Sequence, residues 1–242
     1  MGKQYWRGGN MLYPVPAVMV SCGRPEEKPN IITVAWAGTV CSSPAMVSIS
    51  VRKERYSYDI LKETGEFVIN LITRDLTYAT DFCGVRSGRD VDKFAQMHLT
   101  PLPSQHISVP GIAESPVNLE CKVTQVIPLG SHDMFLAEVL GVTVDEKYMD
   151  ENGKFHLNDA GLVAYSHGEY FELGEKLGKF GYSVAKKQAA KTESVTKSAK
   201  PSGAGKKVAS AENRTASKTG AGNRRKSASK TGSADKQKSR RK

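Results

Sequence analysis

The sequence before residue 186 predicts a mainly β fold with short helices, arranged as a barrel or a sandwich. Short apolar and β-branched runs recur at close spacing, and only a few short stretches have helical character. A doubly wound parallel sheet would need longer helices between its strands. No Gly-x-Gly-x-x-Gly or P-loop motif occurs, so neither a Rossmann site nor a P-loop is indicated.

The first strands are predicted to form a hairpin. Val15–Cys22 is apolar enough for a buried strand, the Pro-containing stretch 24–29 is typical of a turn, and Ile31–Val40 follows as the second strand. The remaining predicted strands are Met46–Val51, Phe67–Leu71, Val117–Val123 and Met134–Val144.

Three of these strands have informative patterns. In Met46–Val51 the serines Ser48 and Ser50 share one face. Val117–Val123 alternates apolar and polar residues, as in a half-buried strand of an antiparallel sheet. Met134–Val144 is apolar on both faces, which predicts either a central strand or one buried in a subunit interface.

The predicted helices are short. Ser57–Glu63 begins with Ser57 as a good N-cap residue, and Gly65 follows as a stop. Leu76–Phe82 and Val91–Met97 are the other two predicted helices.

Charge divides the chain into two predicted parts, a folded domain over 1–185 and a tail over 186–242. The tail carries 18 Lys or Arg against 3 Asp or Glu, a net charge of +15, whereas the whole chain carries +10, so residues 1–185 carry −5. The tail is rich in Lys, Ala and Ser and has no aromatic residue, Ile, Leu, Met or Cys, so we expect it to be disordered.

The cysteines Cys22, Cys41, Cys83 and Cys121 form no Cys-x-x-Cys pair and lack zinc spacing. We therefore expect reduced, buried thiols in a cytoplasmic protein, with no metal site. No signal peptide is recognised, and no stretch is long and apolar enough to span a bilayer, so no membrane partner is expected.

One stretch of basic residues has the composition of a phosphate site. Arg52 and Arg55 lie just before the helix predicted to begin near Ser57, and guanidinium groups, a hydroxyl and free N–H groups at a helix N-terminus bind phosphate well. The alternative is a solvated basic turn after a strand.

Other candidate residues also have two interpretations. Trp36 and the small residues after it are suited to wall a flat aromatic ligand, or Trp36 is a core residue of a hairpin. Lys93 is either a solvated lysine or a cation directed at an anionic ligand. His132 is either a turn residue or a site residue. No pair of carboxylates, nucleophile elbow or catalytic residue stands out.

Taken together, the chain resembles the flavin reductase-like family, in its flavoredoxin branch, over residues 5–185. The matching stretches, in order, are Pro14–Val20, Lys28–Trp36, Ser43–Arg52, Glu63–Asn70, Ser87–Gly88 with Asp92–Phe94, Leu119–Cys121, Gly130–His132 and Gly168–Phe171. Each is weak alone, but eight in the right order are specific. The tail is not part of the family pattern.

The resemblance implies an FMN-binding split β-barrel, usually a homodimer with the cofactor near the interface. By position, Asn30, Thr33, Ala35 and Trp36 would line the flavin. Ser50, Arg52, Arg55 and Ser57 would receive the ring edge or the phosphate. Lys93 would reach the phosphate or the flavin's polar rim, and His132 and Tyr165 would close the pocket. The family more often has Thr where Ser57 stands, and the exchange keeps the hydroxyl.

Three functions follow from these observations. The first is an FMN oxidoreductase that passes electrons from NAD(P)H to free flavin, a metal chelate or another small acceptor. The second is a flavoredoxin-type electron carrier with a ferredoxin-like protein donor. The third is a protein that binds nucleic acid or an acidic partner through the basic tail, with FMN structural or sensory. Since the tail has no aromatic residues, base specificity is not expected.

Overall fold

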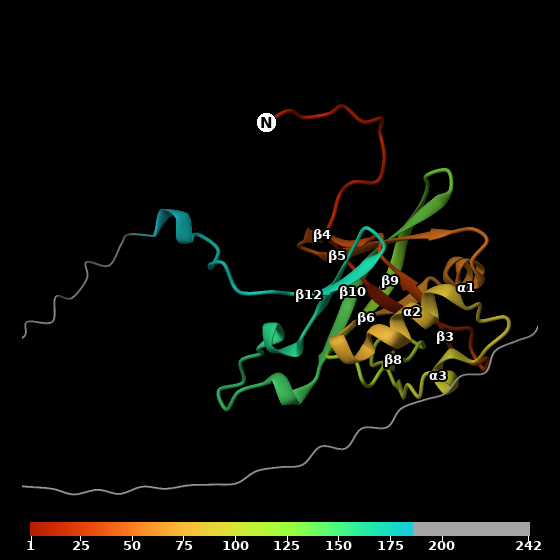
Figure 1. The fold of residues 1–242 in the computed structure, drawn as a ribbon. Helices are drawn as coiled ribbons and strands as arrows, with labels where there is room; N and C mark the ends of the chain where they lie inside the picture. Colours follow the sequence, from red (N-terminus) through yellow and green to blue (C-terminus); the bar gives the residue numbers. More distant parts are fainter. Residues whose placement is uncertain (186–242) are drawn as a thin grey trace, which may run out of the picture. The chain divides into compact units, whose positions relative to one another are not determined.

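The computed structural model describes residues 1–185, of which Met1–Tyr182 form one compact unit. The predictions for 186–242 therefore lie outside the described residues. The centre of the unit is a seven-stranded antiparallel sheet (Figure 1). In the order in which they pair, its strands are β3 (Asn30–Val34), β2 (Val18–Cys22), β6 (Glu66–Leu71), β9 (Val117–Pro128), β10 (His132–Val144), β5 (Ala45–Arg52) and β4 (Ala37–Ser42).

The two edge strands of this sheet follow each other in the sequence. β3 ends at Val34 and β4 begins at Ala37, so the chain crosses from one edge of the sheet to the other through a bend at Ala35 and Trp36. The sheet therefore curls into a split barrel whose edges approach each other at this bend. The prediction of one strand over Ile31–Val40 is wrong, because this crossing divides it in two.

The strand predicted over Val15–Cys22 is also divided. β1 (Val15–Pro16) leaves the main sheet and pairs with β11 (Val163–Ser166), which pairs with β12 (Glu169–Glu172) in a separate small sheet. β2 then pairs with β3, as the predicted hairpin requires. A second small sheet joins β7 (Pro101–Leu102) to β8 (Gly111–Ile112).

The described residues contain three short α-helices. They are α1 (Tyr56–Thr64), α2 (Thr77–Val85) and α3 (Lys93–Gln96), with 3-10 turns η1 (Arg74–Leu76), η2 (Glu146–Tyr148), η3 (Leu157–Ala160) and η4 (Tyr182–Val184). The predicted stop of α1 is confirmed, since Gly65 takes a left-handed conformation and its N–H bonds the carbonyl of Leu61. No helix among these is long and apolar enough to cross a membrane.

Two hydrophobic clusters hold the unit together. One fills the barrel and joins its strands to α1, with Phe67 and Phe135 fully buried. The other lies between β2, β3 and the helices α2 and α3, and includes Ile31 and Phe94. Because both faces of β3 are buried in this way, only its outer edge and its end remain for a ligand.

The long strands β9 and β10 differ in how well the sequence predicts them. β9 was expected to bury only its apolar face, but its polar residues Asn118 and Glu120 are also buried. The segment 105–112 covers them: Glu120 accepts the backbone N–H groups of Gln105 and His106, and Asn118 donates to the carbonyl of Ile112. β10 lies between β9 and β5, which makes it a central strand.

The cysteines are all free, as predicted, and three of them are buried. Burial raises the pKa of Cys22 and of Cys83 to about 11, so both stay protonated thiols at neutral pH. Cys41 departs from the prediction because it lies half-buried on the edge strand β4.

Candidate functional site

Three adjoining cavities follow β3 and take in all of the predicted site residues. We call them the β3 groove. The basic cavity, of about 220 Å³, and the central cavity, of about 200 Å³, share Ile32 and Arg55. The central cavity and the tyrosine cavity, of about 270 Å³, share Thr33 and Ala35. Between them they are lined by Asn30, Thr33, Ala35, Trp36, Ser50, Arg52, Arg55, Ser57, Lys93, His132 and Tyr165.

The basic cavity is built on the N-terminus of α1. The N-cap residue is Arg55, no side chain caps the helix, and Arg55 and the first two residues of the helix, Tyr56 and Ser57, line this cavity. The Arg55 guanidinium is fixed by a 2.6 Å hydrogen bond to the carbonyl of Gly84, at the end of α2. Arg86 and Arg89 line the same cavity. A helix N-terminus surrounded by guanidinium groups attracts an anion.

Ser57 lies inside the first turn of α1, so its predicted role as the N-cap is wrong. Its hydroxyl is buried and accepts a 2.7 Å hydrogen bond from the side-chain amide of Asn30, at the start of β3. The two side chains fit because residue 88 is glycine: a Cβ there would lie 2.1 Å from Oδ1 of Asn30 and 2.7 Å from a ring carbon of Tyr56. A side chain at residue 88 would therefore displace Asn30 and Tyr56, which both line the basic cavity.

Lys93 is buried, so the interpretation of it as a solvated lysine is wrong. Its side chain is 3% exposed, and its ammonium donates to the carbonyls of Ile31 (2.6 Å) and Cys83 (2.8 Å). These bonds use two of its three N–H groups and leave the third for a ligand in the cavity. Burial, together with the nearby charge of Arg55, lowers the pKa of Lys93 to about 8.

The central cavity lies where β5 ends and β10 begins. His132, the first residue of β10, is the cross-strand partner of Arg52, the last residue of β5. Burial and the charge of Arg52 lower the pKa of His132, which keeps the imidazole neutral at pH 7. The backbone N–H of Ser50 donates to the carbonyl of Trp36 (2.8 Å), which holds the bend of the chain over this cavity.

The tyrosine cavity is lined by two tyrosines of one hairpin and by residues of β3 and α2. Tyr165 and Tyr170 are cross-strand partners in the hairpin of β11 and β12, with ring centroids 5.6 Å apart. Tyr13 lines none of the three cavities, but its ring centroid lies 6.3 Å from that of Tyr165 and 6.1 Å from that of Trp36, so it packs against an aromatic residue of each of the two cavities. On the opposite side the Thr33 hydroxyl donates to the carbonyl of Thr80 in α2.

The outer edge of β3 also carries backbone groups that a ligand can use. β3 is an edge strand, and the carbonyl of Ile31 points outward to Lys93. Residues two apart on a strand point the same way, so the N–H and C=O of Thr33 lie on this outer edge as well. A flat ligand with a polar rim therefore meets donors and acceptors in the middle of the groove.

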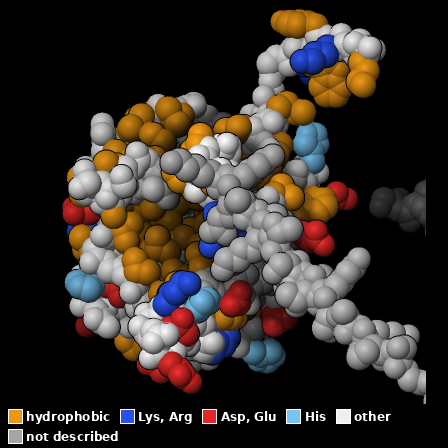
Figure 2. All heavy atoms as spheres, turned by 90° about the vertical axis from the view of Figure 1, so that its left-hand side faces the viewer, with side chains coloured by type: hydrophobic (Ala, Val, Ile, Leu, Met, Phe, Trp, Pro, Cys, Tyr) orange, Lys and Arg blue, Asp and Glu red, His pale blue; other side chains and the backbone are white. Residues whose placement is uncertain are grey.

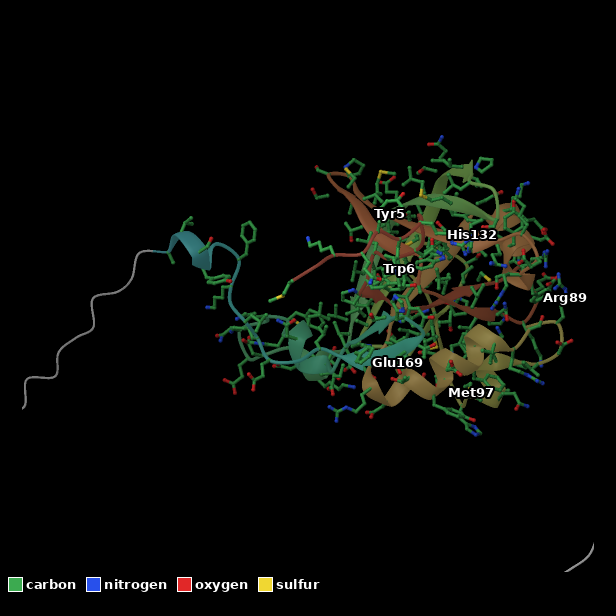
Figure 3. All side chains as sticks on the ribbon, turned by 45° about the horizontal axis from the view of Figure 1, so that its top comes forward. Tyr5, Trp6, Arg89, Met97, His132 and Glu169 are labelled. Carbon is green, nitrogen blue, oxygen red and sulfur yellow. The ribbon has the colours of Figure 1, made fainter. Side chains whose placement is uncertain are left out.

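Some lining residues were not assigned a role from the sequence. Arg86 and Arg89 flank the Ser87–Gly88 motif and are visible as basic residues beside a glycine turn. Arg89 lies with its guanidinium 5.3 Å from the ring centroid of Tyr56, and Figure 3 shows it at the outer edge of the molecule, away from His132. Tyr13, which packs against Trp36 without lining a cavity, has no local sequence signal, because only the fold brings the two residues together.

The groove thus has one cationic end, one aromatic end and a backbone edge between them. It contains no pair of carboxylates or activated nucleophile that would supply acid–base chemistry by itself. Such a site binds and orients a flat, anionic organic molecule, and any redox chemistry there belongs to the bound molecule.

Comparison with solved structures gives the same fold. The flavoredoxin of Desulfovibrio vulgaris (Miyazaki F) matches with a TM-score of 0.70 and 32% identity, over 76% of this chain and all of the flavoredoxin. The flavoredoxin of Methanosarcina acetivorans has a TM-score of 0.69 and 24% identity over the same shares. At that identity the second likeness shows the fold alone.

Sequence comparison extends the relationship. An uncharacterized protein of Archaeoglobus fulgidus is 32% identical over 160 residues, which is 66% of this chain and 88% of that protein. The family model for the flavin reductase like domain matches residues 10–174, which include the whole β3 groove. This chain therefore belongs to the flavin reductase like domain family.

Proposed function

We propose that the chain binds FMN in the β3 groove and acts as an oxidoreductase that takes electrons from NAD(P)H and passes them to a small acceptor such as free flavin or a metal chelate. One observation carries the proposal: the residues that the family resemblance assigns to FMN line three adjoining cavities in the order that the cofactor requires.

The residues present fit the chemical groups of FMN. The phosphate is a dianion, and the basic cavity offers Arg55, Lys93, the Ser57 hydroxyl and the N-terminus of α1. The ring system is flat, and the central and tyrosine cavities offer Trp36 and Tyr165 together with the edge of β3. Bound FMN supplies the redox chemistry, and the protein supplies binding and orientation.

The charges around the groove serve a second purpose. Arg52 borders the central cavity, and its positive charge favours extra negative charge on a bound ring. His132 stays neutral at pH 7, so it acts there as a hydrogen-bonding group. We assign no acid–base role to either residue.

The test combines the colour of the protein with a matched pair of variants. Purified protein should show the absorbance spectrum of bound flavin, with one FMN per chain. Arg55→Met should weaken FMN binding by about 10–100-fold, since a charge-assisted contact is lost. Arg74→Met, which removes an exposed arginine outside the groove, should leave FMN affinity unchanged. A colourless protein that binds no added FMN would overturn the proposal.

A second candidate is an electron carrier that receives electrons from a ferredoxin-like protein. The likeness to a flavoredoxin at 32% identity favours it. Anaerobic stopped-flow mixing separates the two. Bleaching of the flavin absorbance by NADH or NADPH supports the reductase. Bleaching by a reduced ferredoxin-like donor, with no response to either nicotinamide, supports the carrier.

A further inference from the structure

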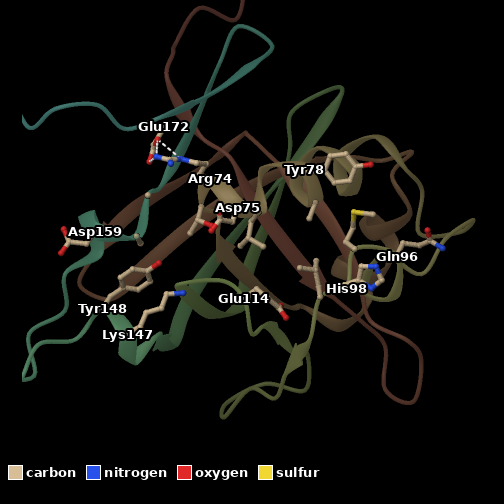
Figure 4. Close-up of a pocket in the computed structure, with 17 residues that line it drawn as sticks. Arg74, Asp75, Tyr78, Gln96, His98, Glu114, Lys147, Tyr148, Asp159 and Glu172 are labelled. Atoms are coloured by element: carbon tan, nitrogen blue, oxygen red, sulfur yellow. Dashed lines mark hydrogen bonds and ion pairs between the residues drawn. The ribbon is translucent and has the colours of Figure 1, made fainter.

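A cavity larger than any of the three in the β3 groove lies apart from the groove and shares no lining residue with it. Its volume is about 780 Å³, and it opens between η1, the start of α2 and the segments that carry η2 and η3 (Figure 4). Nothing in the proposed flavin chemistry uses this cavity.

The floor of the cavity is apolar and its rim is acidic. Leu76, Ala79, Leu99 and Ala160 form the floor, each 5–8% exposed. Four carboxylates lie around the rim against two cations, and the charged rim residues are Arg74, Asp75, Glu114, Lys147, Asp159 and Glu172.

Both cations of the rim are already paired. Arg74 binds Glu172, and Lys147 binds Asp145 at 2.8 Å. Asp75, Glu114 and Asp159 therefore give the rim an excess of negative charge. Figure 4 shows Arg74 and Glu172 at one end of the cavity and Tyr78 with His98 at the other. An apolar floor inside an acidic rim suits an apolar or aromatic group next to a positive charge.

The same chain has an exposed segment that combines aromatic and basic residues. The N-terminal arm, residues 1–12, extends from the rest of the fold (Figure 1) and exposes Tyr5 by 95%, Trp6 by 73% and Leu12 by 86%. Figure 2 shows its hydrophobic and basic side chains protruding together. The arm contains Lys3 and Arg7 and no acidic residue. Tyr5 and Trp6 are adjacent in the sequence and together offer apolar surface that a partner can bury.

We propose that the arm of one copy inserts Tyr5 and Trp6 into this cavity of a second copy, with Arg7 facing the acidic rim. Tyr and Trp are the residues that most often anchor an interface by filling a pocket, and the charges of arm and rim are complementary. Seven residues of extended chain from Tyr13 to Trp6 reach about 25 Å, enough to cross a subunit boundary.

The arrangement favours exchange between copies over binding within one chain. Tyr13, the residue that follows the arm, packs beside Trp36 and Tyr165. From this point the arm projects away from the side of the fold where η1 and α2 begin (Figure 1). In a two-fold dimer each copy gives one arm and receives one, so two aromatic anchors are buried per pair.

Cross-linking between two differently tagged full-length chains tests the proposal. A chain carrying Trp6→Cys is mixed with one carrying Tyr78→Cys, a position on the cavity rim that is 78% exposed. We expect a disulfide-linked heterodimer under mild oxidation. The matched control is Val85→Cys, which is 72% exposed on the same helix but lines the basic cavity, and it should not cross-link.

The double variant Trp6→Cys/Tyr78→Cys distinguishes exchange from binding within one chain. A cross-linked monomer would overturn the proposal, as would absence of the Trp6–Tyr78 heterodimer in the mixed sample. Sedimentation supplies a second readout: Tyr5→Ala/Trp6→Ala should weaken self-association by about 30-fold or more, whereas Phe180→Ala, at an exposed aromatic residue outside the arm, should not. Equal association constants for both would also overturn it.

Discussion

Lys93 gives the groove a predictable dependence on pH. Its ammonium is buried and its pKa is about 8, below the ordinary value of 10.5. Below pH 8 the side chain is charged and attracts the FMN phosphate, and above pH 8 the free protein loses this charge. FMN affinity should therefore fall as pH rises through 8, by at most tenfold per pH unit because one proton is involved.

The measurement is FMN affinity by fluorescence quenching from pH 6.5 to 10. Lys93→Met should bind FMN more weakly at pH 7 and should lose the decline centred near pH 8. Lys147→Met, an exposed lysine outside the groove, should keep it. An unchanged pH profile in Lys93→Met would show that Lys93 does not contact the phosphate.

Gly88 is the second residue whose substitution has a definite expected outcome. In Gly88→Ala the new Cβ would meet both Asn30 and Tyr56 at less than 3 Å, so the Asn30–Ser57 hydrogen bond must break or the turn must shift. We expect a loss of stability of about 1–3 kcal/mol and weaker FMN binding. Urea unfolding and FMN titration measure the two effects. Gly174→Ala, where a Cβ meets nothing within 4 Å, should change neither.

These two residues show what the sequence could and could not predict about the site. The resemblance predicts the lining residues, most of which lie within its short ordered motifs, whereas Arg55, Ser57 and Tyr165 lie between those motifs. It did not predict how they are connected, since Ser57 meets Asn30 across 27 positions and Lys93 meets Ile31 across 62. The sequence therefore predicts Ser57 as a local N-cap, although its hydroxyl makes a contact that only the folded chain creates.

At the scale of elements, a buried hydrogen bond connects α1 to β10. The Tyr58 hydroxyl donates to the Asp133 carboxylate at 2.6 Å, next to His132 in the groove. This bond, aided by Lys53, lowers the pKa of Asp133. A carboxyl whose pKa is lower in the folded state stabilises the fold above its unfolded pKa near 3.8, and this contribution is lost as pH falls through the folded pKa.

Tyr58→Phe tests the contribution of this hydrogen bond, because the variant keeps the ring that packs edge-on against Phe135 and removes only the hydroxyl. We expect the Tm to fall by about 2–4 °C at pH 7. The difference from the wild-type chain should shrink as pH falls below 3.8. Tyr78→Phe, which removes the hydroxyl of an exposed tyrosine, is the control and should have no effect. A difference that stays constant down to pH 2 would contradict the assignment.

The elements that were predicted incorrectly share a physical cause. Val15–Cys22 and Ile31–Val40 are continuous apolar runs, and such a run predicts a strand but not its breaks. The breaks at Ala17 and at Ala35–Trp36 arise where the chain changes partner: β1 leaves to pair with β11, and β4 crosses to the far edge. By contrast, Gly65 ended α1 as predicted, because a helix stop depends on local backbone conformation.

At the scale of the molecule, the flavin site and the basic charge lie in different parts of the chain. Every residue of the β3 groove lies within the family match at 10–174, and residues 1–185 carry a net charge of −5. The +15 of residues 186–242 belongs to a part of the chain that the family match does not include. FMN binding and any binding of polyanions should therefore be separable by truncation.

A chain ending at residue 185 should bind FMN with the same affinity and stoichiometry as the full chain. The two should differ in a gel shift with double-stranded DNA: the full chain should bind it without sequence preference and lose affinity steeply as salt increases, because lysine and arginine displace counterions from the phosphate backbone. The truncated chain should not bind DNA.

Equal DNA binding by both chains would place the contact in the folded domain, and binding by neither would remove nucleic acid as a partner of residues 186–242. Loss of FMN from the truncated chain alone would instead show that the flavin site needs residues beyond the family match.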